Sequence, residues 1–179
     1  MGKIDDEASW DVEGDAKPLT VTQLTPMCAG AAGRREAVMV EIPASARSVI
    51  ESGRLAHLVT INRDDSPQVT CVWVGLDGND IVVGKLAADQ KVRNIRRDPR
   101  VSLSIEAEGD QYGMQHYLVV EGVARIEQGG APALLHALAQ RYIGPGTQFP
   151  PMPDPPEGFV IRISPTRVRG MGPWGITLP

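Results

Sequence analysis

Positive charge is concentrated in one short segment of an otherwise acidic chain. The chain has 179 residues and a net charge of −4. Six cations nevertheless lie between residues 85 and 100, namely Lys85, Lys91, Arg93, Arg96, Arg97 and Arg100. Lysine and arginine bind phosphate and carboxylate groups, and the N-terminus of a helix adds free N–H groups and a favourable dipole. We therefore interpret the segment as a candidate clamp for an anion, with a phosphate-bearing ligand favoured.

Lys91 is the best placed of these cations. The sequence predicts a helix from Asp89 to Arg97, because the residue before a proline avoids the helical conformation and Asp98 precedes Pro99. At 100° per residue, Lys91 lies beside the apolar face in the first turn. Lys85 precedes the helix and can serve the same anion. Arg93, Arg96 and Arg97 are more simply interpreted as solvated helix charges that Asp89 and Asp98 balance.

The rest of the chain predicts an α+β fold, mostly an antiparallel barrel with a few peripheral helices. Two β-branched runs flank an Asp-Gly pair, which is a strong hairpin signal. The predicted elements are helices within 41–55, 89–97 and 131–144, and strands at 55–63, 68–77, 81–86, 100–108, 115–129 and 159–174. The predicted order is α-β-β-β-α-β-β-α-β.

Residues 1–40 differ from the remainder. They are acidic at first and then rich in glycine and alanine, so we expect an extension followed by one domain over 41–179. The start has no signal-peptide pattern, no apolar run is long enough to span a membrane, and the two cysteines form no CxxC pair. We expect a cytoplasmic protein that binds neither a membrane nor, given its pI of about 5.4, nucleic acid.

Other residues that carry chemistry give weaker signals. The three histidines are far apart and match no metal motif, so no metal site is predicted. Cys71 lies in an apolar strand and is expected to be an inert core cysteine. Gly84 within a strand indicates a bulge, a close approach of a ligand, or only a bend. No catalytic residue is assigned.

The stretch from residue 55 to 105 resembles the pyridoxamine-phosphate-oxidase-like split β-barrel family, in its flavin- and deazaflavin-dependent branch. The motifs that carry the resemblance are the hairpin "DDSPQVTCVW", the run "KVRNIRRDPRV", and later "VVEGVARI" and "VIRISPTRVRGMGPW". The match covers residues 42 to about 175. It implies an FMN-binding split barrel that forms a homodimer, with two cofactor sites at the interface.

The resemblance also implies site residues. Lys91 would hold the cofactor phosphate, with Asn94 fixing that turn. The strand with Thr70, Cys71, Val72 and Trp73 would line the ring, with Gln68, Gly84 and Lys85 near the ring or the phosphorylated tail. Gln115 and His116 would approach from the partner subunit, Trp174 would close over the ring, and Arg93 is a candidate for an acidic tail.

The sequence departs from the pyridoxamine-phosphate oxidases proper. It lacks their early basic motifs, and its end "WGITLP" lacks their C-terminal arginine. The form "KLAADQKVRNIRRDP" is more similar to the members that use the deazaflavin coenzyme F-420. The resemblance thus favours an F-420-dependent oxidoreductase that transfers a hydride to or from a flat conjugated molecule. An FMN-dependent enzyme, and a non-catalytic protein that binds flavin, F-420 or haem, are the alternatives.

Overall fold

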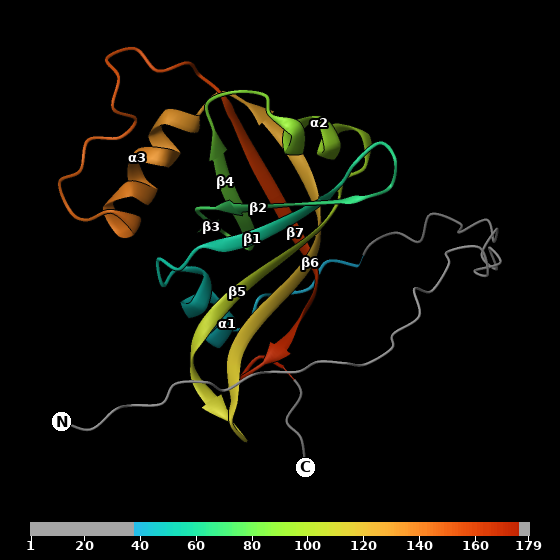
Figure 1. Ribbon diagram of the computed structural model, residues 1–179. Helices are drawn as coiled ribbons and strands as arrows, with labels where there is room; N and C mark the ends of the chain where they lie inside the picture. Colours follow the sequence, from blue (N-terminus) through green and yellow to red (C-terminus); the bar gives the residue numbers. More distant parts are fainter. Residues whose placement is uncertain (1–37, 176–179) are drawn as a thin grey trace, which may run out of the picture. The chain divides into compact units, whose positions relative to one another are not determined.

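The strands form one antiparallel seven-stranded sheet in a computed structural model that describes residues 38–175 (Figure 1). The strand order is β2-β1-β5-β6-β7-β4-β3. The helices are α1 (Ala44–Ile50), α2 (Gln90–Arg97) and α3 (Ala131–Tyr142); the strands are β1 (Ala56–Ile61), β2 (Pro67–Val72), β3 (Gly75–Asp77), β4 (Asp80–Lys85), β5 (Arg100–Gln111), β6 (Met114–Gln128) and β7 (Phe159–Met171). The predicted α+β class is confirmed.

The two edge strands of this sheet are neighbours in the sequence. β2 lies at one edge and β3 at the other, yet only Trp73 and Val74 separate them. Two residues span only about 7 Å, so the sheet must curl until its opposite edges almost meet. The result is a barrel that is split between β2 and β3.

This split corrects one prediction. The run 68–77 was expected to form a single strand, but it forms two, and they pair with different neighbours: β2 pairs with β1, and β3 pairs with β4. The observed order therefore contains one strand more than predicted. The physical reason is that the apolar, β-branched run continues across the corner, so its pattern carries no sign of a change of partner.

Tyr142 of α3 holds the split together. Its hydroxyl oxygen accepts a hydrogen bond from the Val74 N–H at 3.0 Å, and the hydroxyl group donates to the Arg54 carbonyl at 3.1 Å. Its ring stacks on Trp73, with centroids 5.2 Å apart and an angle of 15° between the planes. One side chain thus satisfies the Val74 N–H at the corner and ties the corner to the segment before β1.

The core fills the barrel and joins two helices to it. Inward-facing residues of the long strands form one cluster with Ala46 and Ile50 of α1 and with Val92 and Ile95 of α2. Figure 1 shows α1 and α2 near opposite ends of the barrel. α2 is therefore fixed by its apolar face, and Arg93, Arg96 and Arg97 on its other side are exposed to solvent.

α3 packs outside the barrel, against β4. Gly84 makes this possible, because a Cβ atom at that position would lie 2.8 Å from the Leu135 side chain. The glycine in this strand thus admits a helix side chain. The sequence predicted a bulge, a bend or a close ligand at Gly84. It contained no signal for the packing of a helix side chain.

The extension predicted for residues 1–40 lies almost wholly outside the described residues, and the domain boundary stays a prediction. Val40, which is described, donates its N–H to the Pro165 carbonyl at 2.9 Å. Among residues 38–175, no helix has the length and apolar character needed to cross a membrane.

We predict that Tyr142→Phe destabilises the protein. The change removes only the hydroxyl and leaves the Val74 N–H without its partner, so the free energy of unfolding should fall by about 1–3 kcal/mol. Urea denaturation measures this quantity. Tyr112→Phe, at the exposed tip of the β5–β6 hairpin, is the matched control and should leave stability unchanged. Equal stabilities of the two variants would contradict the closing role of Tyr142.

Candidate functional site

Two lysine ammonium groups bond to the same carboxylate oxygen. Oδ2 of Asp89 lies 2.6 Å from Nζ of Lys91 and 3.0 Å from Nζ of Lys85. The Lys91 side chain is only 6% exposed, which is rare for a lysine. Each ammonium has three donors, so both retain hydrogen-bonding capacity. The cluster of Lys85, Asp89 and Lys91, called the lysine pair below, carries one net positive charge.

Asp89 also caps α2. Its Oδ1 accepts a hydrogen bond from the Val92 N–H at 3.3 Å, as expected for an N-cap aspartate. The predicted helix is confirmed, with its first residue at Gln90 instead of Asp89. The capping carboxylate stands at the helix N-terminus where we expected free N–H groups for an anion. Only the N–H groups of the first turn before Val92 remain for such a ligand.

The charge state of Asp89 is set by opposing effects. Burial acts to raise its pKa, but hydrogen bonds from Lys91 and Lys85 outweigh burial, and the pKa lies below the ordinary value of 3.8. Asp89 is therefore ionised at neutral pH and holds the two ammonium groups in place.

A hollow of about 230 Å³ adjoins the lysine pair, and we call it the Trp73 hollow. It is lined by Leu55, Cys71, Val72, Trp73, Val83, Gly84, Lys85, Leu135 and Phe149. Lys85 belongs both to this lining and to the lysine pair. Five residues that the sequence singled out for a cofactor (Cys71, Val72, Trp73, Gly84 and Lys85) are thus brought together, and Lys91 joins them through Asp89.

β2 contributes free backbone groups beside the Trp73 hollow. Asn62 donates its N–H to the Ser66 carbonyl at 2.8 Å, and bonded pairs alternate with non-bonded pairs along an antiparallel ladder. Val69 and Cys71 therefore direct their N–H and C=O groups away from β1, toward the open edge of the sheet. The Thr70 hydroxyl is buried and has no hydrogen-bond partner among residues 38–175.

Cys71 is exposed, which corrects the expectation of a core cysteine. β2 has a neighbour on one side only, and Cys71 faces outward from the barrel, opposite His57 of β1. The residues around Cys71 in the sequence are apolar, and this pattern does not reveal that the strand lies at the edge of the sheet.

Asn94 is a buried hub between α2 and the β1–β2 hairpin. Its Nδ2 donates to Thr60 Oγ1 at 3.0 Å and to Asn62 Oδ1 at 2.9 Å. Thr60 in turn donates to Gln68 Oε1 at 2.7 Å. This network fixes the helix that carries Lys91 relative to β2, and it consumes the side-chain oxygen of Gln68.

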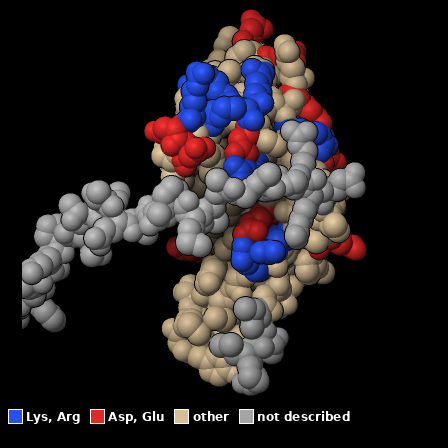
Figure 2. Space-filling view, turned by 90° about the vertical axis from the view of Figure 1, so that its right-hand side faces the viewer, with Lys and Arg blue, Asp and Glu red and all other residues tan. Residues whose placement is uncertain are grey.

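The arginines of α2 lie on the surface above the lysine pair. Figure 2 shows Lys and Arg side chains gathered at the end of the molecule where α2 lies in Figure 1. Arg93 donates to the Ala88 carbonyl and to Gln90, and Arg96 lies 5.1 Å above the Phe159 ring. Within residues 38–175, Arg93, Arg96 and Arg97 form no ion pair with a carboxylate.

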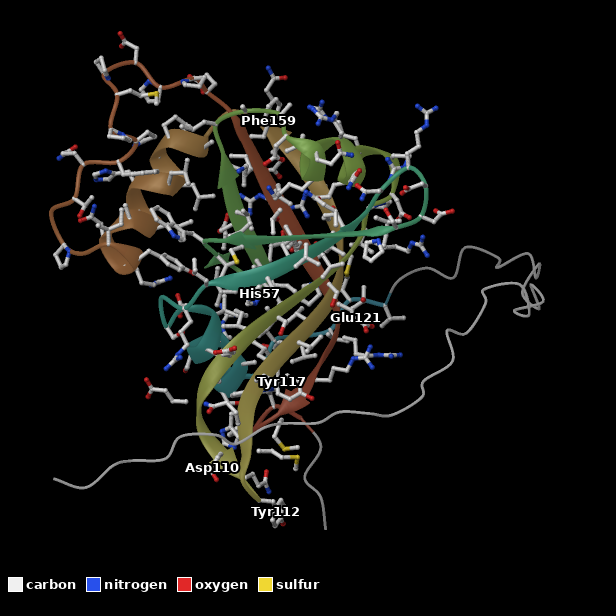
Figure 3. All side chains as sticks on the ribbon, in the orientation of Figure 1. His57, Asp110, Tyr112, Tyr117, Glu121 and Phe159 are labelled. Carbon is white, nitrogen blue, oxygen red and sulfur yellow. The ribbon has the colours of Figure 1, made fainter. Side chains whose placement is uncertain are left out.

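Gln115, His116 and Trp174 lie elsewhere, at the other end of the sheet. Figure 3 shows the separation: Phe159, which pairs with Lys85, is near α2, whereas Tyr117, which follows His116, is toward the tip of the β5–β6 hairpin. Gln115 donates to the Ala107 carbonyl at 2.8 Å. His116 and Trp174 line a second, larger hollow. A single chain thus does not bring the two groups of predicted residues together.

Sequence reasoning missed three contributors to these sites. Asp89 was considered only as a balancing charge, although an aspartate three residues before Val92 is a recognisable N-cap signal. Phe149 packs on Trp73 with centroids 5.1 Å apart, and Tyr142 also stacks on Trp73. No local pattern indicates these long-range contacts. In the described part of the chain, no three His, Cys, Asp or Glu side chains are grouped so as to hold a metal ion.

Comparison with known proteins identifies relatives of this fold. The sequence model of the pyridoxamine 5'-phosphate oxidase family matches residues 42–172. An F-420 reductase structure is 30% identical with a TM-score of 0.60, over 71% of this chain and 98% of that one. The conserved hypothetical protein Rv2991 from Mycobacterium tuberculosis is 28% identical with a TM-score of 0.57, over 80% and 96%. A heme binding protein from Mycobacterium smegmatis is 25% identical with a TM-score of 0.53, over 76% and 57%.

We predict that Asp89 stabilises the fold in a pH-dependent way. Its pKa is lowered in the folded state, so its contribution is present above the ordinary pKa of 3.8 and is lost as the pH falls through the lower folded-state value. Asp89→Asn keeps a capping oxygen but removes the charge. Its free energy of unfolding should lie below that of the unmodified protein at neutral pH and approach it below about pH 3.8.

Chemical denaturation across a pH series measures this difference. The control is Asp154→Asn, which changes an exposed aspartate and should give no pH-dependent gap. A difference in free energy of unfolding between Asp89→Asn and the unmodified protein that stays constant down to the lowest pH would contradict the proposed role of the Asp89 charge.

Proposed function

The chain belongs to the pyridoxamine 5'-phosphate oxidase family, and we propose that it is an oxidoreductase that uses the deazaflavin coenzyme F-420. The observation that carries the proposal is the lysine pair beside the Trp73 hollow, which joins a cationic clamp to an edge strand with free backbone groups. The similarity to an F-420 reductase at 30% identity supports the choice of cofactor.

The lysine pair fits a phosphate ester. Asp89 gathers two ammonium groups at one oxygen, and their remaining donors can reach a dianion that a single lysine would hold less firmly. The net charge of the cluster favours an anion, and Lys91 is too buried for its position to be set by solvent. Lys91 and Lys85 would hold the phosphate, and the Asn94 network would keep α2 in register with β2.

The Trp73 hollow fits one side of a planar ring. Its walls are largely apolar, and the outward N–H and C=O groups of Val69 and Cys71 offer hydrogen bonds to a heteroaromatic edge. The volume of about 230 Å³ is below the roughly 300–1,000 Å³ of closed ligand sites. A second surface must complete it.

A partner subunit would supply that surface. Proteins of this family are commonly dimers that bind flavin cofactors. In the proposed homodimer, Gln115, His116 and Trp174 of one subunit would approach the cofactor held by the other. This accounts for their distance from the lysine pair within one protomer.

The bound cofactor would supply hydride transfer. The chain itself would position the ring through β2, exclude water with the aromatic cluster around Trp73, and hold the anionic end with the lysine pair. Arg93 and its neighbouring arginines, free of carboxylate partners in the described residues, would meet the acidic tail that distinguishes F-420 from FMN.

Two alternatives remain and have specific support. A lysine pair holds the phosphate of FMN as well as that of F-420. The similarity to a heme binding protein favours a non-catalytic binding role. An enzyme would pass electrons from its reduced cofactor to an added acceptor faster than free cofactor does, and a carrier would not.

We predict that Lys91→Met weakens cofactor binding by about tenfold or more, because it removes a charge-assisted hydrogen bond. Lys85→Met should act in the same direction. Fluorescence-quenching titrations with F-420 and, separately, with FMN measure both affinities. The control is Arg100→Gln, since the Arg100 guanidinium is already paired with Asp98 at 2.6 Å. Unchanged cofactor affinity in Lys91→Met would contradict the role of the lysine pair as a phosphate clamp. Tighter binding of FMN than of F-420 would assign the protein to the flavin-using members of the family.

We also predict that the cofactor shields Cys71 from alkylation, because this exposed thiol lines the Trp73 hollow. Labelling with iodoacetamide, followed by mass spectrometry of the peptides, should show slower modification of Cys71 at saturating cofactor. The peptide with Cys28 provides the internal reference. Equal labelling rates at Cys71 with and without bound cofactor would place the ring elsewhere.

A further inference from the structure

The larger hollow lies between α1, the β5–β6 hairpin and the turn after β7. We call it the Trp174 hollow; its volume is about 490 Å³, and its lining includes Ser48, Ser52, Arg54, Glu108, His116 and Trp174. This volume is within the range of sites that bind small molecules. The lysine pair and the Trp73 hollow do not contribute to it.

One wall of the Trp174 hollow is a fixed aromatic plane. The Trp174 indole N–H donates to the Tyr117 carbonyl at 3.0 Å, and the His116 ring meets it edge-on, with centroids 6.2 Å apart at 77°. A Cβ atom at Gly172 would lie 2.7 Å from the indole, so the glycine is what allows the ring to fold back here. A rigid aromatic wall favours a flat, conjugated ligand.

The lining of the Trp174 hollow also carries one cation, Arg54, with a weak partner. Arg54 bonds Glu108 at 3.0 Å, but the side chains are 40% and 89% exposed. Ion pairs this exposed contribute little to stability. A ligand carboxylate inside the hollow can therefore take the place of Glu108 at the guanidinium at little cost.

The other polar groups of the lining act mainly as acceptors. The hydroxyl groups of Ser48 and Ser52 already donate to the carbonyls of Ala44 and Val49. His116 Nδ1 lies 3.1 Å from the Glu108 carbonyl. Because a carbonyl oxygen only accepts, Nδ1 carries a proton that is already engaged in this bond. Arg54 is thus the group in this set that recognises an anion.

We propose that the Trp174 hollow binds a planar conjugated molecule that carries a carboxylate, with its ring against Trp174 and its carboxylate on Arg54. The binding itself is independent of the cofactor. The inference rests on the proposed function in one respect, that this ligand is the substrate, because the proposed homodimer brings His116 and Trp174 beside the partner's cofactor.

The test compares two probes that differ only in charge. Isothermal titration calorimetry of the full chain with 2-naphthoate and with 2-naphthamide should show about tenfold tighter binding of the carboxylate. Arg54→Gln should abolish this preference and leave the amide affinity unchanged. The matched control is Arg47→Gln, because Arg47 lies on α1 and donates to the Gly78 carbonyl at 2.7 Å.

Equal affinity for the two probes, or a preference that survives in Arg54→Gln, would overturn the inference. So would the binding of neither probe. A parallel titration with F-420 and FMN separates the two proposals. Cofactor binding without naphthoate binding would support the proposed function and contradict ligand binding in the Trp174 hollow. Preference for naphthoate without cofactor binding would support ligand binding in the Trp174 hollow and contradict the proposed function.

Discussion

The closure of the sheet at Trp73 and Val74 determines the rest of this structure. Because opposite edges of the sheet are joined by two residues, the barrel can neither open nor shift its register without breaking the corner. The same closure places residues from the end of β2 and the end of β4 around one hollow, which Cys71, Trp73, Gly84 and Lys85 all line. The corner is stabilised from outside the barrel by Tyr142, so α3 supports the site without lining the core.

Asp89 links the fold to its chemistry. One carboxylate caps α2 through Oδ1 and gathers Lys85 and Lys91 through Oδ2. Burial of a lysine costs free energy unless the charge is paired, and Asp89 supplies that pairing while leaving the cluster positive. A lysine that is paired and rigid in this way is pre-organised for an anion, whereas the exposed arginines of α2 are not.

The sequence predicted those features that depend on local signals. The C-terminal end of α2 followed from the Asp98-Pro99 pair, and the place of Lys91 beside the apolar face followed from helical periodicity. The break at Trp73 was not predictable, because the apolar run is continuous while the strand partners change. The exposure of Cys71 depends on the position of β2 at the edge of the sheet. The position of Trp174 depends on its contacts with β6. Both are tertiary facts that no local pattern contains.

The two hollows differ in how they can hold charge, and this difference argues for separate ligands. At the α2 end, two ammonium groups share the Asp89 carboxylate, and three arginines lack carboxylate partners in the described residues. The local electrostatic field therefore favours a multiply charged anion. At the hairpin end, the hollow is lined by a single arginine, an aromatic ring and several acceptors, which suits one carboxylate on a flat ring. A phosphorylated cofactor would lose most of its electrostatic stabilisation in the second hollow. A monocarboxylate would leave most of the positive charge of the first uncompensated.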